Sequence, residues 1–299
     1  MPEAIRCKVI VNPIAGVLKG PAKIRRVRQA LDKLPIEYDL ILTEIPGQAV
    51  ELTRQAVLDG WPLMVAVGGD GTINEVVNGL MKAGGEGEVG TLGIIPLGTG
   101  NDLAYALDLP DDLNAACQRL IRGQTRLLDV GQVNQVYFIN NSAVGLEPMV
   151  SIAHEKMRWL KGKVRYIMAA LKTIAEIKIW SMTIQWDEGR DAGPMILVSV
   201  GNSCRTGGAF YMTPAAKMDD GLLDFIYARQ MNRWEILKIL PRTFTGSHID
   251  HPLITYRRTT TLTITTTPST PIQADGEVIS LDATEINYRI IPQKLRVIV

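Results

Sequence analysis

The first 130 residues alternate between short apolar runs and segments with helical periodicity. Apolar runs rich in β-branched residues predict four strands, at 8–11, 38–42, 63–67 and 91–95. Between them the apolar residues recur at helical spacing, most fully at Ile73, Val76, Val77, Leu80 and Met81. Strands that alternate with helices need crossover connections. We therefore expect an α/β domain whose parallel sheet is covered by helices on both faces.

After about residue 128 the pattern becomes that of successive strands. Strand-like runs occupy 130–140, 181–186, 195–200, 222–228 and 259–267, whereas only 153–179 and 233–244 have helical periodicity. The Thr-rich tract within the last of these runs is read as a strand because Leu262 and Ile264 alternate with Thr. Runs of strands in this order predict a C-terminal antiparallel β-sandwich domain. The expected division is an α/β domain over 1–128, with the tail of about 290–299 packing back on it, and a sandwich domain over 129–289.

Composition narrows the class of protein. The chain has 299 residues, of which 46% are hydrophobic, and a formal net charge of +1, so global disorder is excluded. The same low charge argues against nucleic-acid binding. The three cysteines are odd in number and far apart, which favours a reducing compartment over a disulfide framework. Because no run approaches 18 apolar residues, we expect a cytoplasmic protein without a membrane span.

The strongest local signal is a glycine-rich turn between the third strand and the next helix. Gly68, Gly69, Asp70 and Gly71 follow the strand directly. Glycines allow backbone amides to approach a ligand closely, and a helix N-terminus attracts anions, so the turn predicts a phosphate cradle. Asp70 would repel a bare phosphate and therefore fits best beside Mg²⁺ or a ribose. The alternative is a tight turn without a ligand.

Thr72 and Glu75 have the spacing of a capping box, which we expect to secure the start of that helix. A second turn follows one strand later, where Pro96, Gly98 and Gly100 punctuate the end of the strand. Thr99 and Asn101 add side-chain hydrogen-bonding groups to this turn. Because the carboxyl ends of parallel strands meet at one edge of the sheet, both turns should face the same crevice.

Three segments in this order, VNPIAG, GGDGTINEVVNG and PLGTGNDLA, resemble the diacylglycerol kinase catalytic-domain family, which includes bacterial soluble lipid kinases and sphingosine kinases. GGDGT is shared with NAD kinases and phosphofructokinases, whereas PLGTGNDLA favours the lipid kinases. The resemblance covers nearly the whole chain and implies an NAD kinase/diacylglycerol kinase-like fold that uses ATP and Mg²⁺. The residues that it implies for ATP are Asn12, Pro13, Ile14, Ala15, Gly16, Thr43, Gly68, Gly69, Asp70, Gly71, Thr72, Ile73, Asn74, Glu75, Thr99 and Asn101.

The same resemblance assigns a catalytic role to a late acidic segment, Gln273–Glu277. It implies that Glu277 accepts the proton of the lipid hydroxyl, with Asp275 close by. A hydroxyl has a very high pKa, so phosphoryl transfer to it needs such an acceptor. From the residues alone, Asp275-Gly276 is equally typical of a hairpin turn.

The resemblance further implies a structural Mg²⁺ loop, in which Lys217 and Leu222 supply carbonyl oxygens and Asp220 supplies its carboxylate. Asp102 and Asp129 are expected to connect this loop to ATP through water, near Asp70. The alternative is a plain Asp-Gly turn. One departure from the family is the segment Gly145-Leu146-Glu147, which stands where the family usually has Gly-Phe-Asp.

A basic segment at 154–180 predicts peripheral membrane association. It carries seven Lys or Arg against two Glu, and it includes Trp159 and Tyr166. An apolar stripe runs along it through Met157, Leu160, Val164, Ile167, Met168 and Leu171. A basic amphipathic helix can rest on anionic headgroups. The alternative is a solvated helix that packs its stripe on the sandwich.

Together these features predict an ATP-dependent lipid kinase that transfers the γ-phosphoryl group to the hydroxyl of diacylglycerol or a related lipid. The active site is expected between the two domains, and the lipid partner lies at the membrane surface. The alternatives are an NAD kinase-like or small-polyol phosphotransferase and a nucleotide-sensing regulator without turnover. The acids at 275 and 277 argue against the regulator. The sequence leaves the oligomeric state open, a homodimer included.

Overall fold

A computed structural model describes residues 5–16, 20–85, 87, 89–157 and 162–299, and the chain divides into two compact units. Unit 1 contains residues 1–130 and 292–299, and unit 2 contains residues 131–291. The boundaries expected from the sequence differ from these by two residues at each crossing.

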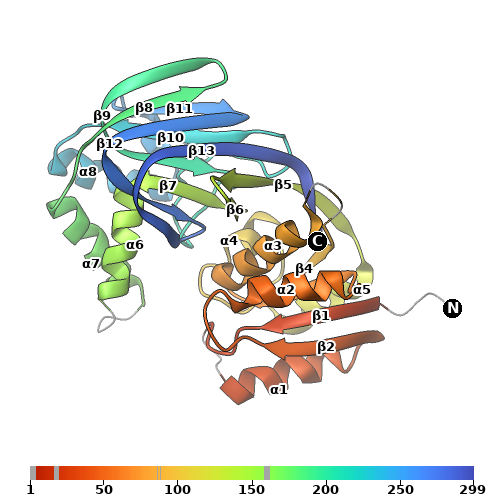
Figure 1. Cartoon of the computed structure of the whole chain (residues 1–299). Helices are drawn as coiled ribbons and strands as arrows, with labels where there is room; N and C mark the ends of the chain where they lie inside the picture. The colour runs from red at the N-terminus through yellow and green to blue at the C-terminus, as the bar shows by residue number, and fades with distance from the viewer. Residues whose placement is uncertain (1–4, 17–19, 86, 88, 158–161) are drawn as a thin grey trace. The chain divides into compact units, whose positions relative to one another are not determined.

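Unit 1 is built on a parallel sheet. Its strands are β1 (Ile5–Val11), β2 (Ile36–Leu42), β3 (Leu63–Gly68) and β4 (Thr91–Pro96), in the order β2-β1-β3-β4 (Figure 1). The end of the last strand, β13 (Glu277–Ile298), pairs in parallel with β4 through Arg296 and Val297. The predicted parallel sheet is thus present, with the chain's C-terminal residues added to it.

Helices cover both faces of this sheet. They are α1 (Gly20–Leu31), α2 (Gln48–Leu58), α3 (Asp70–Gly84), α4 (Asp102–Ala106) and α5 (Leu113–Arg122). The apolar sides of α1 and α5 share one buried cluster with β1 and β3, whereas α2 and α3 pack together against the opposite side of the same strands. The crossovers therefore bring the start of α3 and of α4 to the edge where β3 and β4 end.

Unit 2 is an antiparallel β-sandwich. Its strands are β5 (Thr125–Val133, which crosses from unit 1), β6 (Val136–Phe138), β7 (Asn141–Gly145), β8 (Trp180–Trp186), β9 (Gly189–Gly201), β10 (Leu223–Arg229), β11 (Ile254–Thr259), β12 (Thr261–Ala274) and most of β13. Its interior holds large side chains such as Phe138, Trp180, Phe225 and Tyr288. In the Thr-rich tract, Leu262 and Ile264 are buried while the intervening Thr side chains face outward, which explains its alternation.

The helices of unit 2 are α6 (Leu146–Lys156), α7 (Gly162–Ala175) and α8 (Arg233–Ile239), followed by two 3₁₀ turns, η1 (Leu240–Phe244) and η2 (Ser247–Asp250). The single helix predicted over 153–179 is wrong, since α6 ends at Lys156 and α7 ends at Ala175. Within the basic segment, Trp159 and Leu160 lie outside the described residues, as do the side chains of Val164, Tyr166 and Ile167. Within the described ranges, no helix is long and apolar enough to cross a membrane.

Candidate active site

The loops that follow the strands of unit 1 touch one another through their backbones. The Asn12 amide donates to the Val67 carbonyl at 3.1 Å, the Thr43 amide to Val11 at 2.9 Å, and the Leu97 amide to Gly68 at 2.8 Å. These bonds bring the loops after β1, β2, β3 and β4 to one edge. The sequence-based expectation of a shared edge therefore describes the structure well.

Two glycines are required by this close approach. A Cβ on Gly98 would lie 2.3 Å from the Gly69 Cα atom, and one on Gly16 would lie 1.7 Å from the Leu97 carbonyl oxygen. Gly16 also has a φ of 78°, which disfavours any other residue. The loops at 12–16, 68–71 and 97–101 thus pack into one partly exposed, glycine-rich surface, which we call the cradle and which suits the binding of a polyphosphate.

Asp70, the first residue of α3, is engaged by the loop beside it. The amide of Asp102 donates to Asp70 Oδ1 at 2.6 Å, and the amides of Asn101 and Leu103 contribute further hydrogen bonds. Burial raises the pKa of the Asp70 carboxyl, and these amides partly oppose that rise. Asp70 thus has a structural role at the start of α4, and its expected place beside Mg²⁺ or a ribose stays a prediction. It remains at the cradle.

The predicted capping box does not form. The N-cap of α3 is Gly69 and makes no side-chain hydrogen bond, and Thr72 Oγ1 has no partner within the described residues. Glu75 instead accepts hydrogen bonds from the amides of Gly47 and Ala49, both at 2.9 Å, at the start of α2. The observed N-cap, Gly69, lies three residues before Thr72, the N-cap that the capping box would require.

The other residues expected at the nucleotide divide between the cradle and the interior. The Ile14 amide donates to Asn12 Oδ1, and the Gly98 amide donates to Asn101 Oδ1, so both Asn side chains shape their own loops. Thr99 is exposed on the cradle, and Pro13 and Ala15 are partly exposed. Four of the expected residues are buried: Thr43, Thr72, Ile73 and Asn74. Of these, Ile73 is a core residue.

Lys23, in α1, is a member of this site that the sequence analysis did not identify. Its side chain is 0% exposed, and Nζ donates to the carbonyls of Asn12 at 2.9 Å and Ala15 at 3.0 Å. Burial lowers the pKa of Lys23 to about 8. A usable signal was its spacing, since Lys23 lies four residues before the buried Val27 on the same face of the helix.

In unit 2, Asp275 and Gly276 are the two residues of a hairpin turn between β12 and β13. Both have positive φ, 46° and 87°, as a type I′ turn requires. The Asp275 carboxylate accepts hydrogen bonds from three amides in the turn before β7, those of Ile139 at 2.8 Å and of Asn140 and Asn141 at 2.9 Å. Glu277, the first residue of β13, is exposed to solvent. The two acids therefore have different surroundings: backbone amides hold the Asp275 carboxylate, whereas Glu277 lies on the surface.

A buried polar cluster lies beneath this hairpin. The Asn141 side chain accepts from Thr206 Oγ1 at 2.8 Å and lies 3.5 Å from Ser199 Oγ. Asn141 and Ser199 both hydrogen-bond to Glu147, at the second residue of α6, and burial raises the pKa of Glu147 to about 7. Glu147 is one of the two positions where the sequence departs from the family pattern. Asn141 is therefore bonded both to the Asp275 turn and to a buried acid.

The expected structural metal loop is organised by an arginine. Arg258 forms an ion pair with Asp220, and its Nε atom lies 3.5 Å from Asp224 Oδ2. The amide of Leu222 also donates to Asp220 Oδ1 at 3.2 Å. A guanidinium thus already balances the charge of the single carboxylate in the set Lys217, Asp220 and Leu222, so these residues do not fit a Mg²⁺ ion well. Among the described residues, no group of three His, Cys, Asp or Glu could hold a metal ion.

Asp102 and Asp129 are both buried in unit 1. Asp129, in β5, accepts a hydrogen bond at 2.7 Å from the amide of Gln293, a residue with a φ of 48° in β13. This bond ties the returning C-terminal strand to β5. The structure thus gives Asp129 a structural partner within unit 1.

Comparisons with known proteins cover both units. Residues 6–133 match the model of the diacylglycerol kinase catalytic domain, and residues 141–299 match that of the YegS C-terminal NAD kinase beta sandwich-like domain. A diacylglycerol kinase of Bacillus subtilis (strain 168) is 30% identical over 274 residues, which are 91% of this chain and 89% of that protein.

Two solved structures share the fold. A diacylglycerol kinase from Bacillus anthracis strain Sterne is 20% identical, with a TM-score of 0.75 over 100% of this chain and 98% of that one. An NAD kinase from Archaeoglobus fulgidus in complex with ATP is 15% identical, with a TM-score of 0.55 over 98% and 93% of the two chains. The expected α/β domain with a C-terminal sandwich is confirmed.

Proposed function

Because the chain belongs to the diacylglycerol kinase catalytic-domain family, we propose that it is an ATP-dependent lipid kinase that phosphorylates the hydroxyl of diacylglycerol or a related lipid. The observation that carries the proposal is the cradle of unit 1, where three loops pack so closely that Gly16 and Gly98 have no room for a side chain. Exposed backbone amides at the start of a helix are suited to bind the phosphates of a nucleotide. The ATP bound by the Archaeoglobus NAD kinase is consistent with this use of the fold.

In this proposal the loops at 12–16, 68–71 and 97–101 hold the polyphosphate. Bound Mg²⁺ would neutralise charge on the phosphates, and Asp70 and the buried Asp102 are the carboxylates of the cradle that fit beside it. Lys23 holds the first loop in place through two carbonyl oxygens. No step is assigned to the Asp220 loop, because Arg258 already balances its charge.

Glu277 is the group that we propose to accept the proton. As the lipid oxygen bonds to the γ-phosphorus, its proton passes to the Glu277 carboxylate, and the bond from the γ-phosphorus to the β,γ-bridging oxygen breaks to release ADP. Asp275 acts as a positioning residue, because its carboxylate accepts three backbone amides. This division of roles rests on the exposure of Glu277 and the anchoring of Asp275.

A phosphotransferase that acts on NAD is the second candidate, since the NAD kinase shares the fold at a TM-score of 0.55. The deciding experiment incubates the purified chain with γ-labelled ATP and either NAD or a panel of dispersed lipids: diacylglycerol, a sphingoid base, phosphatidylglycerol and a polyprenol. Chromatography then identifies the labelled product. We expect a labelled lipid that is absent with Glu277→Gln.

The matched control is Glu188→Gln, at an exposed acid in the turn between β8 and β9. It should leave the labelling unchanged. Label on NAD alone would replace the lipid proposal with the second candidate. Label on neither substrate, from a chain that binds ATP in calorimetry, would favour a nucleotide sensor.

A further inference from the structure

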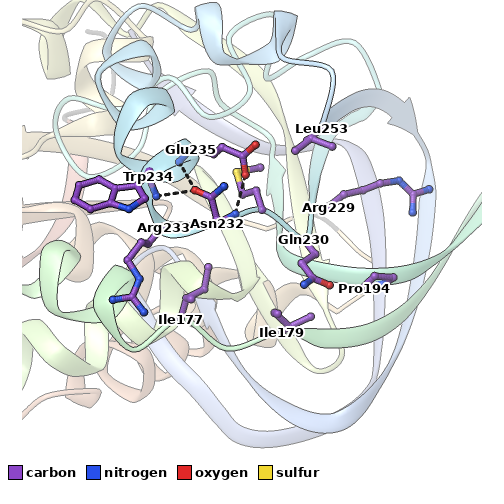
Figure 2. Close-up of a pocket in the computed structure, with 11 residues that line it drawn as sticks. Ile177, Ile179, Pro194, Arg229, Gln230, Asn232, Arg233, Trp234, Glu235 and Leu253 are labelled. Atoms are coloured by element: carbon purple, nitrogen blue, oxygen red, sulfur yellow. Dashed lines mark hydrogen bonds between the residues drawn. The ribbon is translucent and has the colours of Figure 1, made fainter.

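Unit 2 carries a group of exposed apolar side chains around the start of α8. Trp234 is 69% exposed and Ile179, in the segment between α7 and β8, is 42% exposed. Both line an open pocket of about 690 Å³, together with Ile177 and Arg233. Figure 2 shows Ile177, Ile179 and Arg233 at this pocket, with the Trp234 ring extending outward from α8. We call Ile177, Lys178, Ile179, Arg233, Trp234 and Lys238 the α8 surface.

The exposure of Trp234 is built into the local structure. Asn232 forms a capping box with Glu235: its side chain accepts from the amides of Trp234 and Glu235, both at 3.0 Å, and its own amide donates to Glu235 at 2.8 Å. The opposite side of α8 is buried through Ile236 and Ile239. A helix fixed in this way has to present Trp234 to the outside. A large exposed indole on a helix whose start is fixed in this way indicates an interaction site.

The charges around the α8 surface are mainly positive. The exposed basic residues of α7, α8 and the segments that follow them are Lys172, Lys178, Arg233, Lys238 and Arg242. The acids in these elements are Glu176 and Glu235, and Glu235 is held in the capping box. Since α7 packs against α8, these charges belong to one region, and the region is more basic than a chain of net charge +1. Such a region is complementary to an anionic surface.

Apolar and aromatic side chains between basic ones are the combination that binds a membrane interface. Trp and Tyr rings are favoured at the headgroup level, and each nearby Lys or Arg strengthens binding to anionic lipid. A small apolar ligand would favour a closed cavity, whereas this pocket opens beside an exposed ring. We propose that the α8 surface is the membrane-docking surface of unit 2, and that its partner is an anionic lipid bilayer.

This proposal rests on the proposed function, because a lipid kinase must reach a substrate that lies in a membrane. It also differs from the sequence-based expectation, which gave the docking role to the helical segment at 154–180. The added residues come from α8, about 60 residues later in the chain, and the fold brings α7 and α8 together. Docking through this surface would orient unit 2 on the bilayer.

The test is sedimentation of the full chain, without ATP, with vesicles of phosphatidylcholine alone or mixed with phosphatidylglycerol. We expect binding to the mixed vesicles that weakens with salt. Arg233→Glu with Lys238→Glu should lower the affinity at least about 25-fold, taking about fivefold for each basic side chain, the equivalent of about 1 kcal/mol. Trp234→Ala should lower it several-fold, and Trp234→Phe should restore part of the loss.

Matched controls are Arg190→Glu, an exposed base in β9, and Leu58→Ala, an exposed apolar residue at the end of α2. Both should bind vesicles as the parent does. Equal binding by the parent and the α8 variants would overturn the proposal. So would a change of oligomeric state in the α8 variants, seen by sedimentation velocity, because the surface would then be a contact between copies of this chain.

Failure of the kinase proposal can be told apart from failure of docking. Phosphorylation of detergent-dispersed lipid needs no bilayer, so the α8 variants should keep that activity. A chain that binds mixed vesicles through Trp234 but labels no lipid retains the docking surface and loses the proposed activity. A chain that labels dispersed lipid but does not bind mixed vesicles has the proposed kinase activity and lacks the proposed docking surface.

Discussion

Replacing Glu147 by Gln should remove a pH dependence from the stability of unit 2. Glu147 lies in the buried polar cluster with Asn141 and Ser199, and its Oε1 atom has no hydrogen-bond partner within the described residues. Burial raises the pKa of Glu147 to about 7, well above its ordinary value of 4.5. In the unfolded chain the carboxyl is in water and titrates near that ordinary value. The folded protein therefore holds this proton at pH values where the unfolded chain has released it.

The magnitude follows from that difference in pKa. Between about pH 4.5 and pH 7 the folded state binds more protons, so the free energy of unfolding falls as the pH rises. A difference of about 2.5 pKa units corresponds to about 3 kcal/mol over the whole window. The amide introduced by Glu147→Gln does not titrate, so the variant should lose most of this slope. At pH 8 the variant should also be the more stable protein, because it buries no charge.

Urea denaturation at pH 5, 6, 7 and 8 measures the effect. Tryptophan fluorescence reports mainly on unit 2, because Trp180, Trp186 and Trp234 lie there and Trp61 is the residue of this type in unit 1 among the described residues. Other acids change the stability of both proteins alike, so the quantity of interest is the difference between Glu147→Gln and the parent. Glu188→Gln, an exposed acid of the same unit, should show no such difference. If the difference for Glu147→Gln is constant from pH 5 to pH 8, the assignment of a raised pKa to this carboxyl is wrong.

Substitutions at three positions test the residues of the proposed kinase, and a substitution at a fourth position tests the buried lysine. Asp70→Ala should lower kcat at least about 100-fold and also lower the Tm, because α4 loses a cap worth about 1 kcal/mol, whereas Asp70→Asn should keep much of the Tm in a thermal scan. Glu277→Gln should lower kcat by about 10²–10⁴ with little change in ATP affinity by calorimetry. Asp275→Ala should instead destabilise unit 2 by about 1–3 kcal/mol in urea, because it leaves amides without an acceptor. In the parent, the free energy of unfolding should rise between about pH 8 and pH 10.5, because in this range the unfolded chain still binds a proton that the buried Lys23 side chain has lost. Lys23→Met should abolish this rise in urea titrations. An unchanged rise in the variant would contradict the lowered pKa of Lys23.

The meeting of the glycine-rich loops at one edge of the sheet could be predicted from the sequence, because it depends on the order of strands and helices more than on side-chain contacts. Parallel strands joined by helices have their carboxyl ends on one side, so the turns at Gly68 and Gly98 had to be neighbours. Hydrophobic periodicity also predicted the sandwich, where Leu262 and Ile264 point inward from a tract that is otherwise Thr. These features follow from the spacing of residues within one segment.

The hydrogen-bond partners of the acids could not be predicted in this way. Asp70 is held by amides about 32 residues away, Glu75 by amides about 28 residues away, and Asp275 by amides about 135 residues away. Capping and turn rules describe contacts over three or four residues and therefore assigned Glu75 to its own helix. For Lys23 the signal was local. Its spacing from Val27 places it on the buried side of α1, but a charged side chain is usually expected to be exposed to solvent.

The acids of both units share a structural task that bears on how activity should be tested. Asp70 holds the start of α4 and Asp275 holds the turn before β7, so each carboxylate fixes a neighbouring loop without a ligand. A site whose loops are held in this way loses little freedom when its substrate binds. Loss of activity in Asp70→Ala alone would therefore leave two causes mixed, the missing charge and the released loop. Asp70→Asn separates them, because the amide oxygen can still accept the hydrogen bond from Asp102 while the negative charge is gone. A variant that keeps its Tm and its ATP affinity but loses kcat would assign the charge itself to phosphoryl transfer.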